Sequence, residues 1–211
     1  MINIKALLCI HGLLSNCGDF DYIKKEIYPF YDEVICFDVP GHGNNSKSFS
    51  SKNIKQYILD IYDKTSKKYN EIDVIGYSMG GIIACYLQSV RKINKLMLLA
   101  PAYRYLNFKN LNPKKIFETK KNISIDAKKI KYSILFPKIV FDLSYNIMKI
   151  KCDTIIIWGR DDFMVKESSG KDLYKKCISK NKQYHVLNNL DHSSILKSPH
   201  VVNLLVSFLR K

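Results

Sequence analysis

Short apolar runs alternate along the chain with longer segments in which apolar residues recur at helical spacing. This alternation is typical of a parallel β-sheet covered by helices, because each buried strand is followed by a helix that returns the chain to the same end of the sheet. We therefore expect an α/β fold with a mostly parallel sheet of about six strands flanked by helices. The predicted strands cover residues 6–10, 34–38, 73–75, 95–100, 154–158 and 183–187.

The clearest helical periodicity covers residues 53–66, which therefore predict an amphipathic helix. The apolar face of this helix is formed by Ile54, Ile58, Ile61 and Thr65, and its candidate N-caps are Ser50, Ser51 and Asn53. Residues 80–90 and 201–209 also have helical spacing. Their strongly apolar composition predicts that both helices are buried against the sheet.

Residues 102–151 interrupt the alternation of strands and helices. This segment is rich in Lys, contains no Gly, and has three helix-like patches around Ile116, Ala127 and Val140. The chain has no internal repeat, low-complexity tract or Gly/Ser linker that would mark a domain boundary. We therefore expect one domain over residues 1–211, with an insertion at about 102–151.

The composition indicates a globular protein of the cytoplasm. Hydrophobic residues make up 46% of the 211 residues, which is enough for a buried core. No apolar segment reaches the roughly 18 residues of a membrane span, and the run at 6–10 is too short for a signal peptide. The six cysteines form no CxxC pair, a pattern that favours reduced thiols. We expect cytoplasmic localisation without stable membrane insertion.

The formal net charge of +15 raises the question of an anionic partner. Most of the basic residues are Lys, however, and they are spread along the chain as singles and pairs. The sequence has no motif that combines a basic cluster with stacking aromatics or a recognition helix. We therefore expect no nucleic-acid partner. Binding to nucleic acid or to an anionic membrane is the alternative, and it would show a steep salt dependence.

Candidate chemistry is concentrated in Gly76-Tyr77-Ser78-Met79-Gly80, a G-x-S-x-G motif between an apolar strand and an apolar helix. In this setting the serine occupies a sharp strand-to-helix turn, and the two glycines leave room around it. The amino terminus of the following helix directs N–H groups toward developing negative charge. The motif predicts that Ser78 is a nucleophile.

Four further segments extend this picture. They are Cys-Ile-His-Gly-Leu-Leu at 9–14, Asp-Val-Pro-Gly-His-Gly at 38–43, Ile-Ile-Ile-Trp-Gly-Arg-Asp-Asp at 155–162 and Leu-Asp-His-Ser at 190–193. With the serine motif, they make nearly the whole chain resemble the α/β-hydrolase superfamily, in particular its small esterase and monoglyceride-lipase-like members. The chain starts almost directly on what resembles the family's third strand, so we expect the first hairpin of that fold to be missing.

The resemblance implies a catalytic triad in the chain order Ser, acid, His. His192 is the candidate base, because it alone among the five histidines follows the serine in a loop just beyond a strand. Family spacing favours Asp162 as the acid, with the adjacent Asp161 as the alternative. The family's geometry also implies an oxyanion hole formed by the backbone N–H groups of Leu13 and Met79.

The expected function is hydrolysis of a small-molecule acyl ester through an acyl-enzyme, without a cofactor or a metal ion. A thioesterase or acyltransferase using the same triad, or a non-catalytic ligand-binding protein of this fold, are the alternatives. Family likeness places residues 102–151 as a cap over the site, and its length suggests short to medium acyl chains or a monoacylglycerol-like ester. Candidate pocket residues of the cap are Tyr103, Tyr105, Phe108, Phe117, Phe136, Phe141 and Met148.

Overall fold

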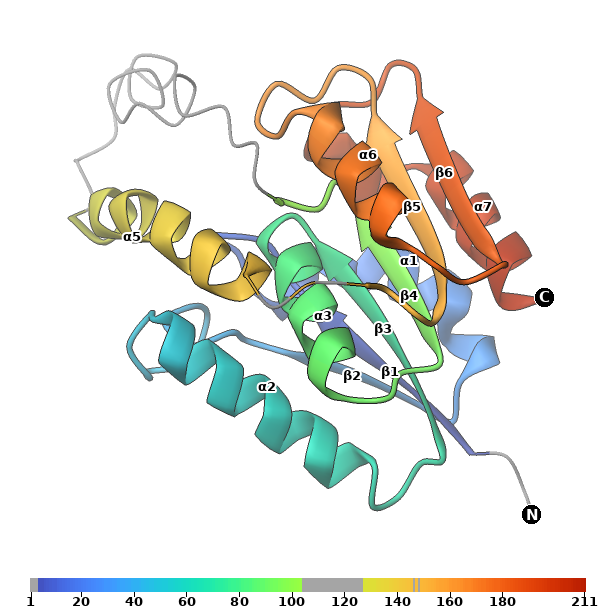
Figure 1. Ribbon diagram of the computed structural model, residues 1–211, viewed down its shortest axis with the longest axis horizontal. Coiled ribbons are helices and arrows are strands. Elements are labelled where there is room, and N and C mark those ends of the chain that lie inside the picture. Colours follow the sequence, from blue (N-terminus) through green and yellow to red (C-terminus); the bar gives the residue numbers. More distant parts are fainter. Residues whose placement is uncertain (1–3, 104–126, 146, 148) are drawn as a thin grey trace.

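Six strands form one sheet in the order β2-β1-β3-β4-β5-β6, with every neighbouring pair parallel (Figure 1). The computed structural model describes residues 4–103, 127–145, 147 and 149–211. The strands are β1 (Lys5–Ile10), β2 (Glu33–Phe37), β3 (Glu71–Tyr77), β4 (Lys95–Leu99), β5 (Asp153–Gly159) and β6 (Lys182–Leu187). All six predicted strands are confirmed, and β3 is longer than the run that predicted it.

The strand order places a topological switch point next to β1. The chain goes from β1 to β2 on one side and then returns to β3 on the other side of β1. The loops that leave the carboxyl ends of β1 and β3 therefore diverge, and this divergence opens a crevice in which α/β proteins bind ligands. A ligand-binding site is therefore expected at the carboxyl ends of β1 and β3.

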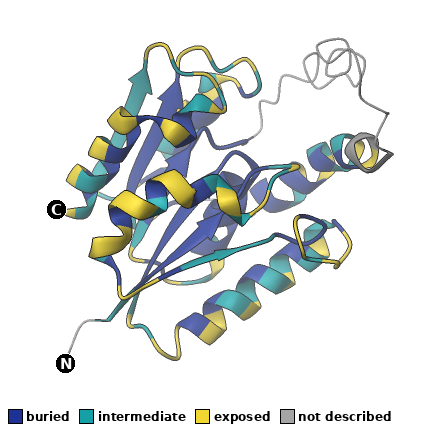
Figure 2. Ribbon diagram, turned by 180° about the vertical axis from the view of Figure 1, so that it is seen from behind, coloured by how far each residue is buried: buried dark blue, intermediate teal, exposed yellow. Residues whose placement is uncertain are grey.

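Helices cover both faces of the sheet, which explains why its central strands are almost entirely buried (Figure 2). One face packs against α1 (Asp21–Ile27) and α7 (Pro199–Leu209). The other packs against α2 (Ser51–Thr65), α3 (Met79–Val90) and α6 (Glu167–Lys176), and α5 (Ala127–Ser144) lies against α2 and α3. Among the described residues, 3-10 helices lie at Cys17–Phe20 (η1), Tyr28–Phe30 (η2) and Ser194–Lys197 (η3).

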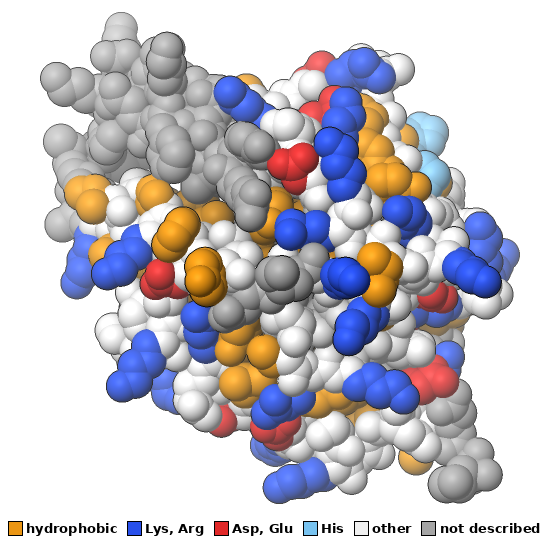
Figure 3. All heavy atoms as spheres, viewed as in Figure 1, with side chains coloured by type: hydrophobic (Ala, Val, Ile, Leu, Met, Phe, Trp, Pro, Cys, Tyr) orange, Lys and Arg blue, Asp and Glu red, His pale blue; other side chains and the backbone are white. Residues whose placement is uncertain are grey.

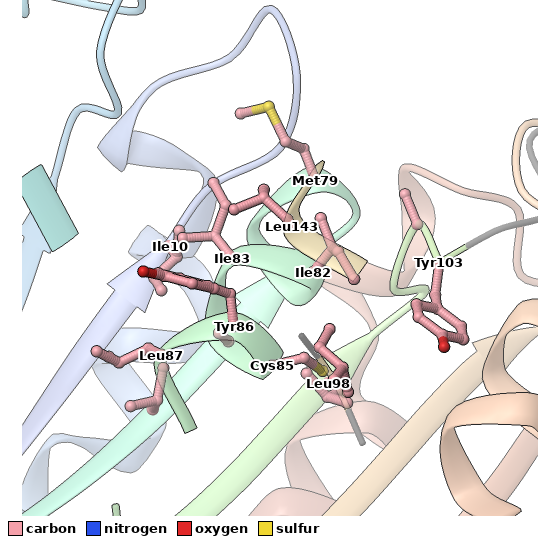
Figure 4. Close-up of a cluster of buried hydrophobic side chains, with 14 of the residues drawn as sticks. Ile10, Met79, Ile82, Ile83, Cys85, Tyr86, Leu87, Leu98, Tyr103 and Leu143 are labelled. Atoms are coloured by element: carbon pink, nitrogen blue, oxygen red, sulfur yellow. The ribbon is translucent and has the colours of Figure 1, made fainter. Parts of the chain in front are cut away.

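The α3 helix is the centre of the larger core cluster. Its residues are buried from Met79 to Gln88, as the apolar composition of 80–90 predicted. Figure 4 shows this cluster, in which side chains of α3 lie between Ile10 of β1, Leu98 of β4 and Leu143 of α5. Because α3 begins directly after Ser78, this packing fixes the position of the candidate nucleophile.

The α2 helix begins as predicted but buries a slightly different face. Its N-cap is Ser50, whose side chain accepts a hydrogen bond from the backbone N–H of Asn53 at 3.2 Å. Ile54, Ile58 and Thr65 are buried. The fourth buried residue is Tyr62, because its hydroxyl donates to the carbonyl of Lys92 and so satisfies the polar end of the ring. Ile61 is half-buried.

The described part of the insertion consists mainly of α5. This single helix contains the patches predicted around Ala127 and Val140, whereas the patch around Ile116 lies outside the described residues. Pro137 lies within it. Two helices were not predicted, α1 and α6. Across the described ranges, no helix combines the length and apolarity needed to cross a bilayer.

Candidate active site

Ser78 lies on the turn between β3 and α3 with a strained backbone. Its φ of 51° and ψ of −114° are a conformation that side-chain-bearing residues rarely adopt. The turn requires very close backbone packing, because a Cβ on Gly80 would lie 1.8 Å from the carbonyl oxygen of Ile10. A Cβ on Gly76 would lie 2.4 Å from the carbonyl oxygen of Gly80. The two motif glycines therefore allow the turn that exposes the serine hydroxyl to the crevice.

A continuous hydrogen-bonded series joins Ser78, His192 and Asp162. The Ser78 Oγ lies 2.9 Å from His192 Nε2, and His192 Nδ1 lies 2.7 Å from Asp162 Oδ2. The Asp162 carboxylate can only accept a hydrogen bond, so His192 Nδ1 carries the proton and donates it. His192 Nε2 is then unprotonated and accepts the hydrogen bond of the Ser78 hydroxyl. The arrangement allows the serine proton to move to the imidazole during nucleophilic attack.

The other oxygen of the Asp162 carboxylate is held by the backbone. Oδ1 accepts hydrogen bonds from the N–H groups of Met164 and Val165, both at 2.9 Å. The Asp162 side chain is 1% exposed, whereas the neighbouring Asp161 is exposed and its backbone N–H donates to the carbonyl of Leu190. Of the two adjacent carboxylates, the structure brings Asp162 to the histidine.

The three side chains are largely shielded from water. Ser78 is 7% exposed and the His192 side chain 12%. Shielding strengthens each hydrogen bond of the series, because fewer water molecules compete for the same donors and acceptors. The nearby Asp191 has a depressed pKa, chiefly because the backbone N–H of Ser194 donates to its carboxylate, so it adds negative charge at the rim.

A cavity of about 460 Å³ opens onto Ser78 and His192. Its apolar wall is formed by Leu13 of the loop after β1, Phe136 of α5, the turn after β5 and Leu196 of η3. Ser133 of α5 and Asp19 of η1 add polar groups. A concave, mainly apolar cavity with a few polar groups beside a nucleophile is suited to a small acyl substrate.

The candidate oxyanion-hole residues lie at the crevice as well. Leu13 lines the cavity, and Met79 is the first residue of α3, where helix N–H groups lack intrahelical partners. Two residues near this loop were not singled out from the sequence. Asp19 accepts hydrogen bonds from the N–H of Gly12 and the hydroxyl of Ser15, and Tyr77 contacts both the Gly12 and His192 loops.

The cap residues proposed as pocket lining have different environments. Phe136 lines the cavity, Tyr103 is fully buried, and Phe141 is 67% exposed on the outside of α5. The other four, Tyr105, Phe108, Phe117 and Met148, lie outside the described residues. Of the three described candidates, one therefore faces the cavity.

His11, from the segment at 9–14, and His42, from the segment at 38–43, are both buried. His11 Nε2 accepts from the N–H of Val39 at 2.9 Å, and its Nδ1 lies 2.7 Å from the carbonyl of Gly12. Burial lowers the pKa of His11, so the ring is neutral and donates from Nδ1. His42 packs against His11 at a ring separation of 5.3 Å. These histidines join the loops after β1 and β2.

In the part of the chain that the structure describes, no three His, Cys, Asp or Glu side chains lie together in a way that could hold a metal ion. All six cysteines are free thiols.

A parallel sheet with a serine on a strained strand-to-helix turn, linked to His and Asp at the carboxyl edge, defines the class of α/β hydrolases. A family model described as "alpha/beta hydrolase fold" matches residues 5–129. The chain belongs to that family.

Similarity to curated proteins extends over most of the chain. It is 27% identical to the monoacylglycerol lipase ABHD6 of Mus musculus, over 97% of this chain and 75% of that protein. It is 33% identical to the putative esterase/lipase 2 of Mycoplasma genitalium, over 54% of this chain and 43% of that protein.

Solved structures share the fold at lower sequence identity. A monoacylglycerol lipase from Paleococcus ferrophilus has a TM-score of 0.74 at 16% identity, with 99% of this chain and 96% of that chain covered. An esterase from Exiguobacterium antarcticum has a TM-score of 0.72 at 16% identity, with 100% and 94% covered.

Proposed function

We propose that this chain hydrolyses carboxylic esters through an acyl-enzyme on Ser78. The observation that carries the proposal is the series in which Ser78 Oγ lies 2.9 Å from His192 Nε2 and His192 Nδ1 lies 2.7 Å from Asp162 Oδ2. Similarity to proteins named monoacylglycerol lipase and esterase supports an ester as the bond that is cleaved.

In the proposed reaction, Ser78 attacks the acyl carbonyl while His192 accepts the hydroxyl proton. Asp162 orients the imidazole and stabilises the imidazolium that forms. His192 then returns the proton to the departing alcohol, leaving the acyl group on Ser78. Water deprotonated by the same histidine attacks this acyl-enzyme, releases the carboxylic acid and regenerates the serine.

The negative charge of the tetrahedral intermediate needs hydrogen-bond donors within reach. The proposal assigns this role to the backbone N–H groups of Met79 and Leu13. Met79 begins α3, whose amino-terminal partial positive charge also favours an oxyanion. Because both donors are backbone groups, replacing either side chain tests packing as well as chemistry.

The substrate is proposed to be a short- to medium-chain acyl ester or a monoacylglycerol-like ester. The cavity of about 460 Å³ and its apolar wall support a small acyl group. Residues 102–151 are proposed to act as a cap, since α5 contributes Ser133 and Phe136 to the cavity. On the face seen in Figure 3, Lys and Arg are scattered among neutral and acidic side chains. This distribution favours a small ester substrate over a nucleic acid or an anionic membrane as the partner.

Intact mass spectrometry after exposure to a fluorophosphonate tests the nucleophile. We expect one phosphonyl adduct on the wild-type protein, mapped by peptide sequencing to Ser78. Ser78→Ala should give no adduct and lose hydrolysis of p-nitrophenyl butyrate while keeping the wild-type melting temperature. Folded wild-type protein without an adduct, or Ser78→Ala with a tenth or more of the wild-type rate, would overturn the proposal.

Parallel assays separate the ester from the thioester. The same preparation is given p-nitrophenyl butyrate and a butyryl thioester of matched concentration, with glycerol added in a third reaction as an acyl acceptor. The proposal expects higher kcat/KM on the oxygen ester and release of free butyrate. Preference for the thioester or dominant transfer to glycerol would assign the triad to one of the alternative activities.

A further inference from the structure

Tyr77, the residue before the proposed nucleophile, contacts the loop that carries His192. Its hydroxyl donates a hydrogen bond to the backbone carbonyl of His192 at 3.0 Å. Its ring also packs on the imidazole, with a centroid separation of 5.1 Å and an interplanar angle of 38°. One side chain therefore contacts both the backbone and the ring of the candidate base.

The same ring contacts the loop after β1. A Cβ built on Gly12 would lie 2.9 Å from Cε1 of Tyr77, so Gly12 and the ring are in direct contact. Tyr77 itself is fixed by β3, where it pairs with Leu99 of β4. The side chain thus extends from the rigid centre of the sheet, along the crevice, to the two loops that flank Ser78.

Before His192, the carbonyl of Leu190 accepts a hydrogen bond from the backbone N–H of Asp161 in the turn after β5. Residues 191–194 are organised by local bonds. Asp191 accepts from the N–H groups of Ser193 and Ser194, and its own N–H donates to Ser194 Oγ. These bonds stiffen residues 191–194 but do not attach them to the sheet. Asp162 holds the imidazole, whereas Tyr77 holds the backbone from which the imidazole extends.

We propose that Tyr77 is a positioning residue for the general base, holding the His192 loop so that Nε2 stays within hydrogen-bond distance of Ser78. The proposal rests on the proposed function, because positioning matters only if His192 takes the serine proton. A misplacement of the base by a fraction of an ångström reduces the share of molecules in which proton transfer and attack occur together.

The hydroxyl of Tyr77 remains a donor throughout the pH range of esterase assays. Burial, followed by the negative charges of Asp19 and Asp162, raises the pKa of Tyr77 well above its ordinary value. Tyr77 cannot replace His192 as the base, since its hydroxyl faces the His192 carbonyl and stays protonated. Its contribution is therefore geometric.

Tyr77→Phe removes the hydroxyl and keeps the ring. We expect kcat on p-nitrophenyl butyrate to fall roughly 5- to 50-fold, a part of the 10²–10⁴ that a well-placed general base contributes. KM should stay within about twofold, because the hydroxyl donates to the His192 carbonyl rather than to the substrate. The rate of fluorophosphonate labelling should fall by a factor similar to that of kcat, since labelling needs the same activated serine.

Tyr62→Phe is the matched control. Tyr62 also donates its hydroxyl to a backbone carbonyl, that of Lys92, but it lies on α2 away from the crevice. The control should lose a comparable amount of thermal stability and keep the wild-type kcat. A Tyr77→Phe variant with kcat within twofold of Tyr62→Phe, or a rise in KM with unchanged kcat, would overturn the proposal.

Ser78→Ala in the same series distinguishes the two proposals. If Ser78→Ala is inactive and Tyr77→Phe matches Tyr62→Phe, the positioning role is wrong and the nucleophile stands. If Ser78→Ala keeps a tenth or more of the activity, the proposed function fails, and the positioning role fails with it.

Discussion

The carboxylate of Asp162 lies 2.7 Å from Nδ1 of His192 through one oxygen and accepts two backbone N–H groups through the other. Because each carboxylate oxygen has its own partners, the orientation of the Asp162 side chain is fixed. An amide in its place would keep its oxygen on the N–H groups of Met164 and Val165, because only the oxygen can accept there. The amide nitrogen would then face His192 and donate where an acceptor is required.

Asp162→Asn is therefore expected to favour the wrong histidine tautomer without disturbing the turn. The expected loss of kcat at neutral pH is about two to four powers of ten. The corresponding change in a serine-protease triad lowers kcat by about 10⁴. Rates on p-nitrophenyl butyrate and thermal melts of the same preparations provide the measurement.

Asp161→Asn is the matched control for that variant. Asp161 is exposed and next in sequence, so its charge acts on the site through solvent and is screened by salt. Its loss should change kcat by less than about threefold. If Asp161→Asn is the crippled variant and Asp162→Asn is near wild type, the acid is assigned to the wrong residue.

The periodic features of the fold could be predicted because they depend on local sequence. Six apolar runs became the six parallel strands, and the G-x-S-x-G motif marked the turn at Ser78. The α6 helix was missed since only Ser169, Gly170 and Leu173 of its ten residues are buried, which leaves no apolar stripe to detect. Tyr62 of α2 was absent from the predicted apolar face, because a tertiary hydrogen bond to the carbonyl of Lys92 allows its burial.

The candidate site, like the fold, could be predicted from the sequence only in part. Ser78 and His192 could be singled out by motif and chain order, whereas two adjacent aspartates on one turn differ only in the direction each side chain takes. Tyr77 donates its hydroxyl to the backbone carbonyl of His192, which lies 115 positions later in the chain, and no local sequence pattern encodes that contact. Residues whose role depends on such long-range contacts became visible only with the structure.

His11 makes a separate prediction about pH and stability. Burial lowers its pKa in the folded state, so the unfolded chain binds the proton more readily as pH falls. Its contribution to stability is complete above the unfolded value of about 6.5 and is lost progressively as pH falls below it. His11→Gln keeps an acceptor near the N–H of Val39 but does not titrate. The urea midpoint of this variant should therefore depend less on pH between 7.5 and 5.

The difference between the wild-type and His11→Gln curves isolates the contribution of this residue from those of the other titrating groups. His185, whose pKa is also lowered by burial, is half-exposed and provides a comparison with a weaker expected effect. Equal pH dependence in wild type and His11→Gln would contradict a buried neutral His11.

The wall of the cavity nearest α5 predicts how the proposed cap selects acyl chains. Phe136 lines the cavity and is 3% exposed, so replacing it with Leu shortens the side chain at the wall and leaves space beside the substrate. Each methylene of a longer acyl chain that enters this space gains roughly 0.8 kcal/mol from burial. For Phe136→Leu, the ratio of kcat/KM on p-nitrophenyl octanoate to that on the acetate should rise about threefold or more.

Phe141→Leu controls for the same substitution on the same helix, since Phe141 is 67% exposed and absent from the cavity wall. Its octanoate-to-acetate ratio should equal that of wild type. Thermal melts of both variants separate selectivity from lost packing, because Phe136 also belongs to the larger core cluster and its replacement lowers stability. If Phe136→Leu reduces kcat/KM equally on acetate, butyrate and octanoate esters, the ring supports the fold and takes no part in choosing the acyl chain.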